Sequence, residues 1–305
     1  MRIAKYHGTG NDFVLVEDLD DRAPLPSALI AALCDRHRGV GADGLIRIVR
    51  GALFGGRADF TMDYANADGE PAEMCGNGIR CVGKYVFERR LTERTEVGVS
   101  TRAGVKRLRL DVDGGTVRSV TVDMGPPALD RGSIPMAGDP AATFLNGSFT
   151  VAGRAYAASA LSMGNPHLVL FLDPDDDLDA LDVPAIGRAA EHDPTFPERT
   201  NVEFVQAAGG RLRMRVWERG SGLTLACGTG ACATLVAANL AGLAERRSEV
   251  EVPGGVLWID WRADDHVVLT GPATFVFEAD LDPAWVAAVD GGEARATVGD
   301  RGVPS

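Results

Sequence analysis

Two stretches of the sequence, Cys75-Gly-Asn-Gly-Ile-Arg-Cys81 and Cys227-Gly-Thr-Gly-Ala-Cys232, place a cysteine before two glycines and a helix-like continuation. The surrounding residues match as well, since positions 60–78 align without a gap to positions 212–230. Three shorter matches keep the same order, at 10–16 with 164–170, 103–105 with 254–256, and 125–126 with 271–272. Such ordered self-similarity indicates two homologous halves.

The two halves have the same predicted layout. In each, alternating apolar residues predict short strands that lead toward the cysteine, and helical spacing predicts a helix after it, at 79–90 and at 231–243. Hairpins follow at 105–123 and 256–270. A single helix that recurs among consecutive hairpins predicts an α+β fold with two homologous domains and mostly antiparallel sheets.

The composition narrows the class of protein. The 305 residues suffice for two domains of about 150 residues. The formal net charge of −12 disfavours nucleic acid and anionic membranes as partners. No stretch reaches the roughly 18 apolar residues that span a bilayer, and the first residues lack the apolar core of an export signal. We therefore expect a cytoplasmic protein whose five cysteines, an odd number, are thiols.

The position of each repeated cysteine suggests its chemistry. A thiol at the start of a helix faces unpaired N–H groups and the positive end of the helix dipole, which should lower its pKa. The glycines let an anion approach the same N–H groups closely, so Gly76-Asn77 and Gly228-Thr229 are candidate cradles for a carboxylate. Each motif therefore predicts an activated thiol, Cys75 or Cys227, beside a carboxylate cradle.

Two such thiols suit the inversion of a carbon that bears hydrogen. If the halves face each other about a pseudo-twofold axis, Cys75 and Cys227 approach one point from opposite sides. One thiolate can then remove a proton from one face while the other thiol returns a proton to the opposite face. Helix N–H donors would stabilise the carbanion between them. Cys34, Cys81 and Cys232 lack the repeated context and are interpreted as small buried hydrophobes.

Seven segments together resemble one known family, the diaminopimelate epimerases. They are HGTGNDF at 7–13, NADG at 66–69, MCGNGIRC at 74–81, MGNPH at 163–167, TNVEF at 200–204, WERG at 217–220 and ACGTG at 226–230. The resemblance extends over about residues 1–278. It implies interconversion of LL- and meso-2,6-diaminopimelate, an amino acid of lysine and peptidoglycan precursor synthesis, with no pyridoxal phosphate and no metal.

The resemblance also implies roles for individual residues. It makes Cys75 and Cys227 the acid/base pair and assigns the α-carboxylate to the two cradles. It assigns substrate binding to six polar residues: Asn11, Asn66, Asn165, Asn201, Glu218 and Arg219. His167 and Glu218, which lie near the thiols in the family, would help to set the protonation of the thiols. Arg219 would hold the distal carboxylate as a bidentate partner. Family members often have glutamine where this chain has Gly44, so that substrate contact is left open.

The family's architecture implies boundaries for the domains. Each domain would be a barrel-like β-sheet wrapped around a central helix, and the protein would be a homodimer. The first domain would comprise 1–125 with 268–280 returning to it, and the second 126–267. Residues 281–305 would be a surface helix and a loose tail.

Other classes of protein share parts of these motifs. A proline racemase or hydroxyproline epimerase also uses paired thiols, and a non-catalytic amino-acid-binding protein would keep the cradles and Arg219. GVGADG at 39–44 fits the dinucleotide fingerprint, but a helix-like segment at 28–38 precedes it, which is the reverse of the required order. LACGTG at 225–230 is similar to a methyltransferase motif that would need a buried parallel strand before it. Zinc is disfavoured because the histidines are scattered and no Cys-x-x-Cys pair occurs.

Overall fold

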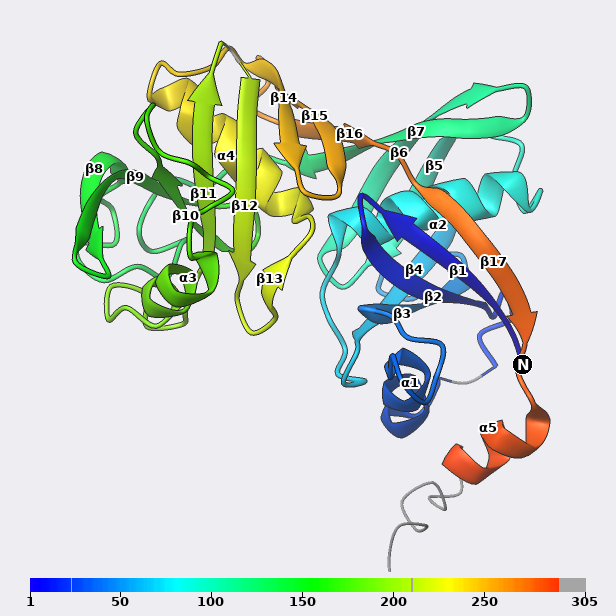
Figure 1. The fold of residues 1–305 in the computed structure, drawn as a ribbon. Helices are drawn as coiled ribbons and strands as arrows, with labels where there is room; N and C mark the ends of the chain where they lie inside the picture. The colour runs from blue at the N-terminus through cyan, green and yellow to red at the C-terminus, as the bar shows by residue number, and fades with distance from the viewer. Residues whose placement is uncertain (23, 210, 291–305) are drawn as a thin grey trace, which may run out of the picture.

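A computed structural model describes residues 1–22, 24–209 and 211–290. Two lobes lie side by side, each with a helix held against its strands (Figure 1). The helices are α1 Ser27–Cys34, α2 Gly76–Glu88, α3 Val183–Glu191, α4 Gly228–Leu240 and α5 Pro283–Asp290. None of the helices in the described part of the chain is long and apolar enough to cross a membrane.

The first lobe carries eight strands in the order β17-β1-β2-β3-β4-β5-β6-β7. Their bounds are β1 Arg2–Gly8, β2 Asn11–Glu17, β3 Gly44–Arg50, β4 Phe60–Asn66, β5 Glu96–Thr101, β6 Gly104–Asp113, β7 Thr116–Gly125 and β17 Thr274–Asp280. The last of these comes from the far end of the chain and pairs with β1. The first lobe is therefore completed by residues that follow the second.

The second lobe repeats this order with β8-β9-β10-β11-β12-β14-β15-β16, and the short β13 pairs with β12. The bounds are β8 Phe144–Val151, β9 Arg154–Ser162, β10 Pro166–Phe171, β11 Asn201–Ala208, β12 Arg211–Glu218, β13 Gly222–Thr224, β14 Arg247–Val252, β15 Gly255–Trp261 and β16 Val267–Gly271. Antiparallel pairing between β16 and β7 joins the two lobes.

The strand pairings of the two lobes correspond, as the internal repeat of the sequence predicts. The parallel pairs β2–β3 and β4–β5 of the first lobe correspond to β10–β11 and β12–β14 of the second. Phe60 thus pairs with Val99 as Leu212 pairs with Val250. The other pairings are antiparallel, so the predicted α+β fold with two related halves is confirmed. The domain boundaries stay a prediction, and β16, Val267–Gly271, spans the predicted boundary at 267/268.

The two central helices begin earlier than predicted. Both start at the glycine after the cysteine, at Gly76 and Gly228, and end at Glu88 and Leu240. Glycine has a low helix propensity, so the pattern of apolar residues did not reveal the first turn. The cysteines themselves are the N-caps of α2 and α4. Most residues of both helices are buried, which places the glycine-rich turns inside the protein.

Other predicted elements need correction or lie outside the described residues. The helix-like segment at 28–38 ends at Cys34, because Asp35 accepts hydrogen bonds from the N–H groups of His37 and Arg38 and forms a turn instead. The predicted surface helix after 281 is α5, whereas the predicted loose tail from 291 onward lies outside the described residues. The antiparallel β13, rather than a buried parallel strand, precedes 225–230, which excludes the methyltransferase interpretation.

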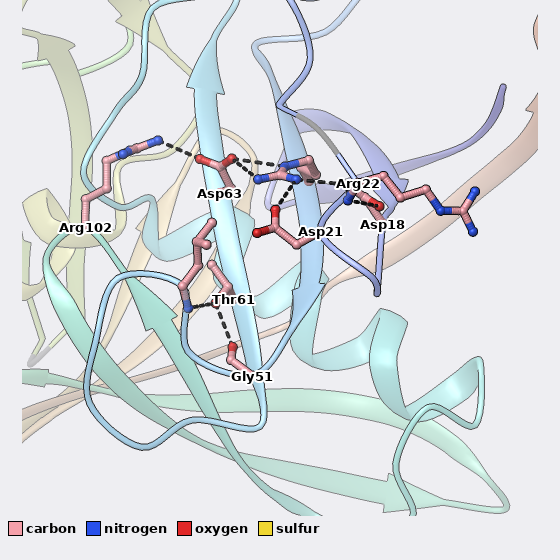
Figure 2. Close-up of polar contacts among 9 residues, drawn as sticks. Asp18, Asp21, Arg22, Gly51, Thr61, Asp63 and Arg102 are labelled. Carbon is pink, nitrogen blue, oxygen red and sulfur yellow. Dashed lines mark hydrogen bonds and ion pairs between the residues drawn. The ribbon is translucent and has the colours of Figure 1, made fainter.

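Asp18 and Asp21, in the loop after β2, and Asp63 of β4 lie around one guanidinium group (Figure 2), which belongs to Arg47 of β3. Arg47 Nη1 donates to Asp18 Oδ2 and to Asp21 Oδ1, both at 2.8 Å, and its Nε donates to Asp63 Oδ2 at 3.1 Å. Arg102 donates to the other oxygen of Asp63 at 2.7 Å. Arg47 is only 3% exposed, and the three carboxylates around its guanidinium balance its charge.

Candidate active site

The N-termini of α2 and α4 meet at the junction of the two lobes. A Cβ atom added to Gly228 would lie 3.3 Å from the Cα of Gly76, and one added to Gly76 would lie 3.5 Å from the Cα of Gly228. A Cβ atom at either position would already be in van der Waals contact with the opposite helix, so the first turns of the two helices are close neighbours. The two Cys-Gly-x-Gly motifs, 152 residues apart in the sequence, therefore face each other.

One side chain connects the two motifs directly. Asn77 Nδ2 donates at 3.0 Å to the carbonyl oxygen of Ala226, the residue before Cys227. The same amide nitrogen donates at 3.2 Å to Asn11 Oδ1. The first carboxylate cradle is thus fixed to the backbone that carries the second thiol.

Cys75 is partly exposed and faces a hydrogen-bond acceptor. Its Sγ donates to Asn11 Oδ1 at 3.4 Å, and Asn11 Nδ2 in turn donates to Asp43 Oδ2 at 2.6 Å. An oxygen acceptor beside sulfur favours the protonated thiol. Burial raises the pKa of Cys75 to about 11, and backbone hydrogen bonding at Gly78 opposes that shift.

Cys227 is buried and faces hydrogen-bond donors. Its Sγ accepts from the N–H of Gly230 at 3.4 Å and lies 3.4 Å from Thr229 Oγ1. Burial nevertheless raises the pKa of Cys227 well above its usual value, and the charges of Glu218 and Glu203 raise it further. The predicted lowering of both thiol pKa values is therefore wrong for the substrate-free protein, because desolvation outweighs the N–H groups of the helix start.

A chain of hydrogen bonds lies behind Cys227. Asn165 Nδ2 donates to Thr229 Oγ1 at 3.3 Å, and Asn165 Oδ1 lies 2.9 Å from His167 Nε2. Because a carbonyl oxygen can only accept, Nε2 carries a hydrogen. His167 Nδ1 lies 2.7 Å from Glu203 Oε1, and both side chains are completely buried. This chain holds the amide of Asn165 beside the second cradle.

Glu218 is electrostatically coupled to both thiols. Its charge raises the pKa of Cys75 as well as that of Cys227. Burial raises the pKa of Glu218 itself, while hydrogen bonds from Thr224 and Cys227 oppose the shift. The carboxyl group therefore belongs to the same electrostatic cluster as the two sulfur atoms.

The remaining predicted substrate-binding residues, Asn201, Arg219 and Asn66, have fewer contacts with the thiol motifs. Asn201 uses both ends of its amide on the backbone, donating to the oxygen of Pro166 at 2.8 Å and accepting from the N–H of Arg219 at 2.9 Å. The exposed guanidinium of Arg219 donates to the oxygen of Glu198 at 3.3 Å. Asn66 is exposed at the end of β4, opposite Gly44 on β3. The structure thus brings together most of the predicted site, while Asn66 has no side-chain hydrogen bond to another described residue.

Sequence reasoning gave no role to three residues that the structure places at the site. Thr9 and Arg80 both hydrogen bond to Asn77, and Glu203 contacts His167. Two of them stand in quoted motifs as charged residues between apolar neighbours, Arg80 between Ile79 and Cys81 and Glu203 between Val202 and Phe204. That charge in an otherwise apolar pattern was the available signal.

Two grooves of about 700 and 400 Å³ lie elsewhere on the protein. The larger groove is lined by residues of the first lobe around β5, β6 and β7, together with Arg262 and Val268. Neither groove contains any of the predicted site residues. The meeting of the helix N-termini, rather than the size of a hollow, therefore locates the candidate site.

Structures with the same fold include two amino-acid epimerases or racemases. A hydroxyproline epimerase from Agrobacterium vitis with bound trans-4-hydroxy-L-proline has a TM-score of 0.68 at 16% identity, with 96% of this chain and 98% of that chain covered. A probable proline racemase from Agrobacterium radiobacter with bound carbonate has a TM-score of 0.67 at 14% identity, with 95% of each chain covered. Identities this low show a shared fold alone.

Sequence relatives are far closer. Proteins named diaminopimelate epimerase are 45% identical over 284 residues in Acetivibrio thermocellus and 46% identical over 286 residues in Synechocystis sp.. Each match covers 92% of this chain and 99% of the relative. The family model described as diaminopimelate epimerase matches residues 3–129 and 159–276. The resemblance noted in the sequence is confirmed, and the chain belongs to the diaminopimelate epimerase family.

Proposed function

We propose that this isomerase interconverts LL- and meso-2,6-diaminopimelate by transferring protons at the α-carbon between Cys75 and Cys227, without a cofactor. The observation that carries the proposal is the meeting of two cysteine-capped helix N-termini across the lobe junction. Relatives at about 45% identity that carry the name diaminopimelate epimerase support the choice of substrate.

The proton steps balance without a further reactant. The reacting pair holds one proton, on one of its two sulfurs. The thiolate takes the α-proton, so that an S–H bond forms as the C–H bond breaks, and the electron pair passes into the α-carboxylate. The opposite thiol then gives its proton to the other face of the carbon. The enzyme is left with the proton on the first sulfur, ready for the reverse reaction.

The N-termini of α2 and α4 can stabilise the negative charge that develops on the α-carboxylate during the reaction. Gly76-Asn77 and Gly228-Thr229 lie in the first turns of α2 and α4, so their backbone N–H groups would stabilise the negative charge that an α-carboxylate bound there gains. Arg219 is exposed and could turn to the distal carboxylate, while Asn201 fixes its backbone. A substrate with two amino-acid ends fits this division into a reacting end and a recognised end.

Isotope exchange tests the proposal. The reduced protein is incubated in deuterium oxide with LL-2,6-diaminopimelate and no added cofactor, and α-deuterium and the LL/meso ratio are followed. We expect deuterium incorporation together with formation of the meso isomer. Inversion of proline or hydroxyproline alone would leave the two-thiol mechanism and change the substrate. Absence of exchange with any amino acid would favour the binding-protein alternative.

We also propose that the protein works in the cytoplasm as a homodimer. All five cysteines are free thiols, which suits a reducing compartment. The edge strand β17 exposes Phe275, Val276 and Phe277, each more than 40% accessible. An apolar edge strand of this kind readily pairs with a second copy.

Sedimentation velocity should give twice the monomer mass, and Phe277→Asp should reduce it to the monomer mass; a wild-type monomer would contradict the proposal.

A further inference from the structure

The buried arginine of α2 differs from the other deeply buried arginine of the described chain in how its charge is balanced. Arg80 is 0% exposed, yet each of its hydrogen bonds goes to a neutral oxygen. Nε donates to Pro272 O at 3.1 Å, Nη1 to Gly76 O at 2.9 Å, and Nη2 to Asn77 Oδ1 at 3.0 Å and Thr9 Oγ1 at 3.2 Å. Arg47, by contrast, has carboxylates on its guanidinium.

Burying a cation without a carboxylate partner costs free energy of desolvation. We therefore expect the charge of Arg80 to interact with an anion during function. Burial lowers the pKa of Arg80, which reflects that cost. The backbone is nonetheless arranged to admit the guanidinium. A Cβ atom at Gly8 would lie 3.0 Å from Nη2, and one at Gly271 would lie 3.1 Å from Nε. Glycines on two strands therefore provide the space that the buried charge occupies.

The position of Arg80 points to the first cradle as the place where its charge acts. The guanidinium binds the carbonyl of Gly76 and the side chain of Asn77, which are the two cradle residues. By occupying Asn77 Oδ1, it turns the amide so that Nδ2 donates to Ala226 and Asn11. Arg80 thus orients the side chain of Asn77, which links the two thiol motifs, and places a positive charge next to the first cradle.

The thiols near Arg80 respond to its charge. Cys75, Cys81 and Cys232 are the titratable groups that interact with it, and its charge lowers the pKa of each. Around Cys75, the charge of Glu218 acts in the opposite direction, and Tyr64 and Cys81 are further titratable neighbours. Since burial holds Cys75 as a thiol, a fixed cation that favours the thiolate offsets part of that penalty.

We propose that Arg80 is a positioning residue whose buried, unpaired charge orients the Asn77 cradle and favours anions there, namely the Cys75 thiolate and the substrate carboxylate. The inference rests on the proposed function for the identity of the carboxylate. The effect on Cys75 does not depend on it. Arg80 acts on the reacting groups indirectly, through its hydrogen bonds to Gly76 and Asn77.

Alkylation of Cys75 tests the proposal without using catalysis. The rate of its reaction with iodoacetamide is followed by peptide mass spectrometry across pH in the wild type, Arg80→Gln and Arg80→Lys. We expect the midpoint for Cys75 to rise in Arg80→Gln, because a nearby positive charge is lost. Arg80→Lys should keep the wild-type midpoint. In the epimerase assay, Arg80→Gln should raise KM more than it lowers kcat.

Arg47→Gln is the matched control, since it also removes a buried arginine from the first lobe. It should lower the melting temperature and leave the Cys75 midpoint unchanged. An unchanged midpoint in Arg80→Gln, or an equal shift in Arg47→Gln, would overturn the proposal. If Arg80→Gln does not fold, Arg80→Lys decides, because a raised midpoint in a variant that keeps the positive charge would contradict the electrostatic role. A wild type that fails to epimerise would refute the proposed function and leave this readout intact.

Discussion

Replacement of either Cys75 or Cys227 by alanine is expected to abolish epimerisation of diaminopimelate. Each thiol serves one face of the α-carbon, so the remaining thiol has no partner to complete the inversion. We expect conversion of LL to meso isomer to fall by about a thousand-fold or more, as for the loss of a positioned acid or base. Proton NMR in deuterium oxide, with loss of the α-proton signal and formation of the meso isomer followed together, measures the effect.

Cys232→Ala provides the control for that experiment. Cys232 is completely buried on α4, the helix that Cys227 caps, but lies outside the reacting pair. The variant should lose some stability through its small cavity and keep its activity. Near-wild-type conversion in either Cys75→Ala or Cys227→Ala would rule out the two-thiol mechanism.

Gly254→Ala is expected to reduce kcat/KM by roughly 100-fold, because a displacement of about 1 Å at an active site can cost that much. A Cβ atom at Gly254 would lie 1.7 Å from the carbonyl oxygen of Thr9, so the β14–β15 turn and the β1–β2 turn could not keep their contact. That contact joins the two lobes next to Asn11 and Thr9. The substitution should therefore displace one thiol motif from the other. Steady-state kinetics with circular dichroism to check folding measure this outcome.

Gly98→Ala is the matched glycine substitution. Its added Cβ atom would meet no atom closer than 3.5 Å, which is ordinary contact. We expect wild-type kcat/KM from this variant. If Gly254→Ala were equally active, the close contact between the two turns would not be needed to align the thiols.

The hairpins of the two halves were predictable from the sequence because each one pairs segments that are neighbours along the chain. The hairpins at 105–123 and 256–270 correspond to β6–β7 and β15–β16. The start of α2 was missed because Gly76 and Gly78 disfavour helix in isolation and are helical only where tertiary packing fixes them. The return of β17 to β1 came from the family resemblance, since nothing in residues 274–280 names their partner.

The electrostatics of the site were the least predictable part. The helix start was visible in the sequence, and its N–H groups do favour a thiolate. The desolvation that outweighs them at Cys75 and Cys227 depends on packing from both lobes, and no single segment contains it. Arg80 was overlooked for a related reason, because only the fold reveals that its partners are Pro272, Thr9 and two cradle residues rather than a carboxylate.

The pairing of β17 with β1 has a consequence for how the protein is made. A ribosome releases residues 2–8 long before it adds residues 274–280, so β1 lacks its outer neighbour through most of synthesis. During that time its unpaired N–H and C=O groups can attach to other nascent chains. The first lobe therefore cannot mature before the second lobe has been translated, and a fragment that ends at Gly125 would be a poor independent folding unit.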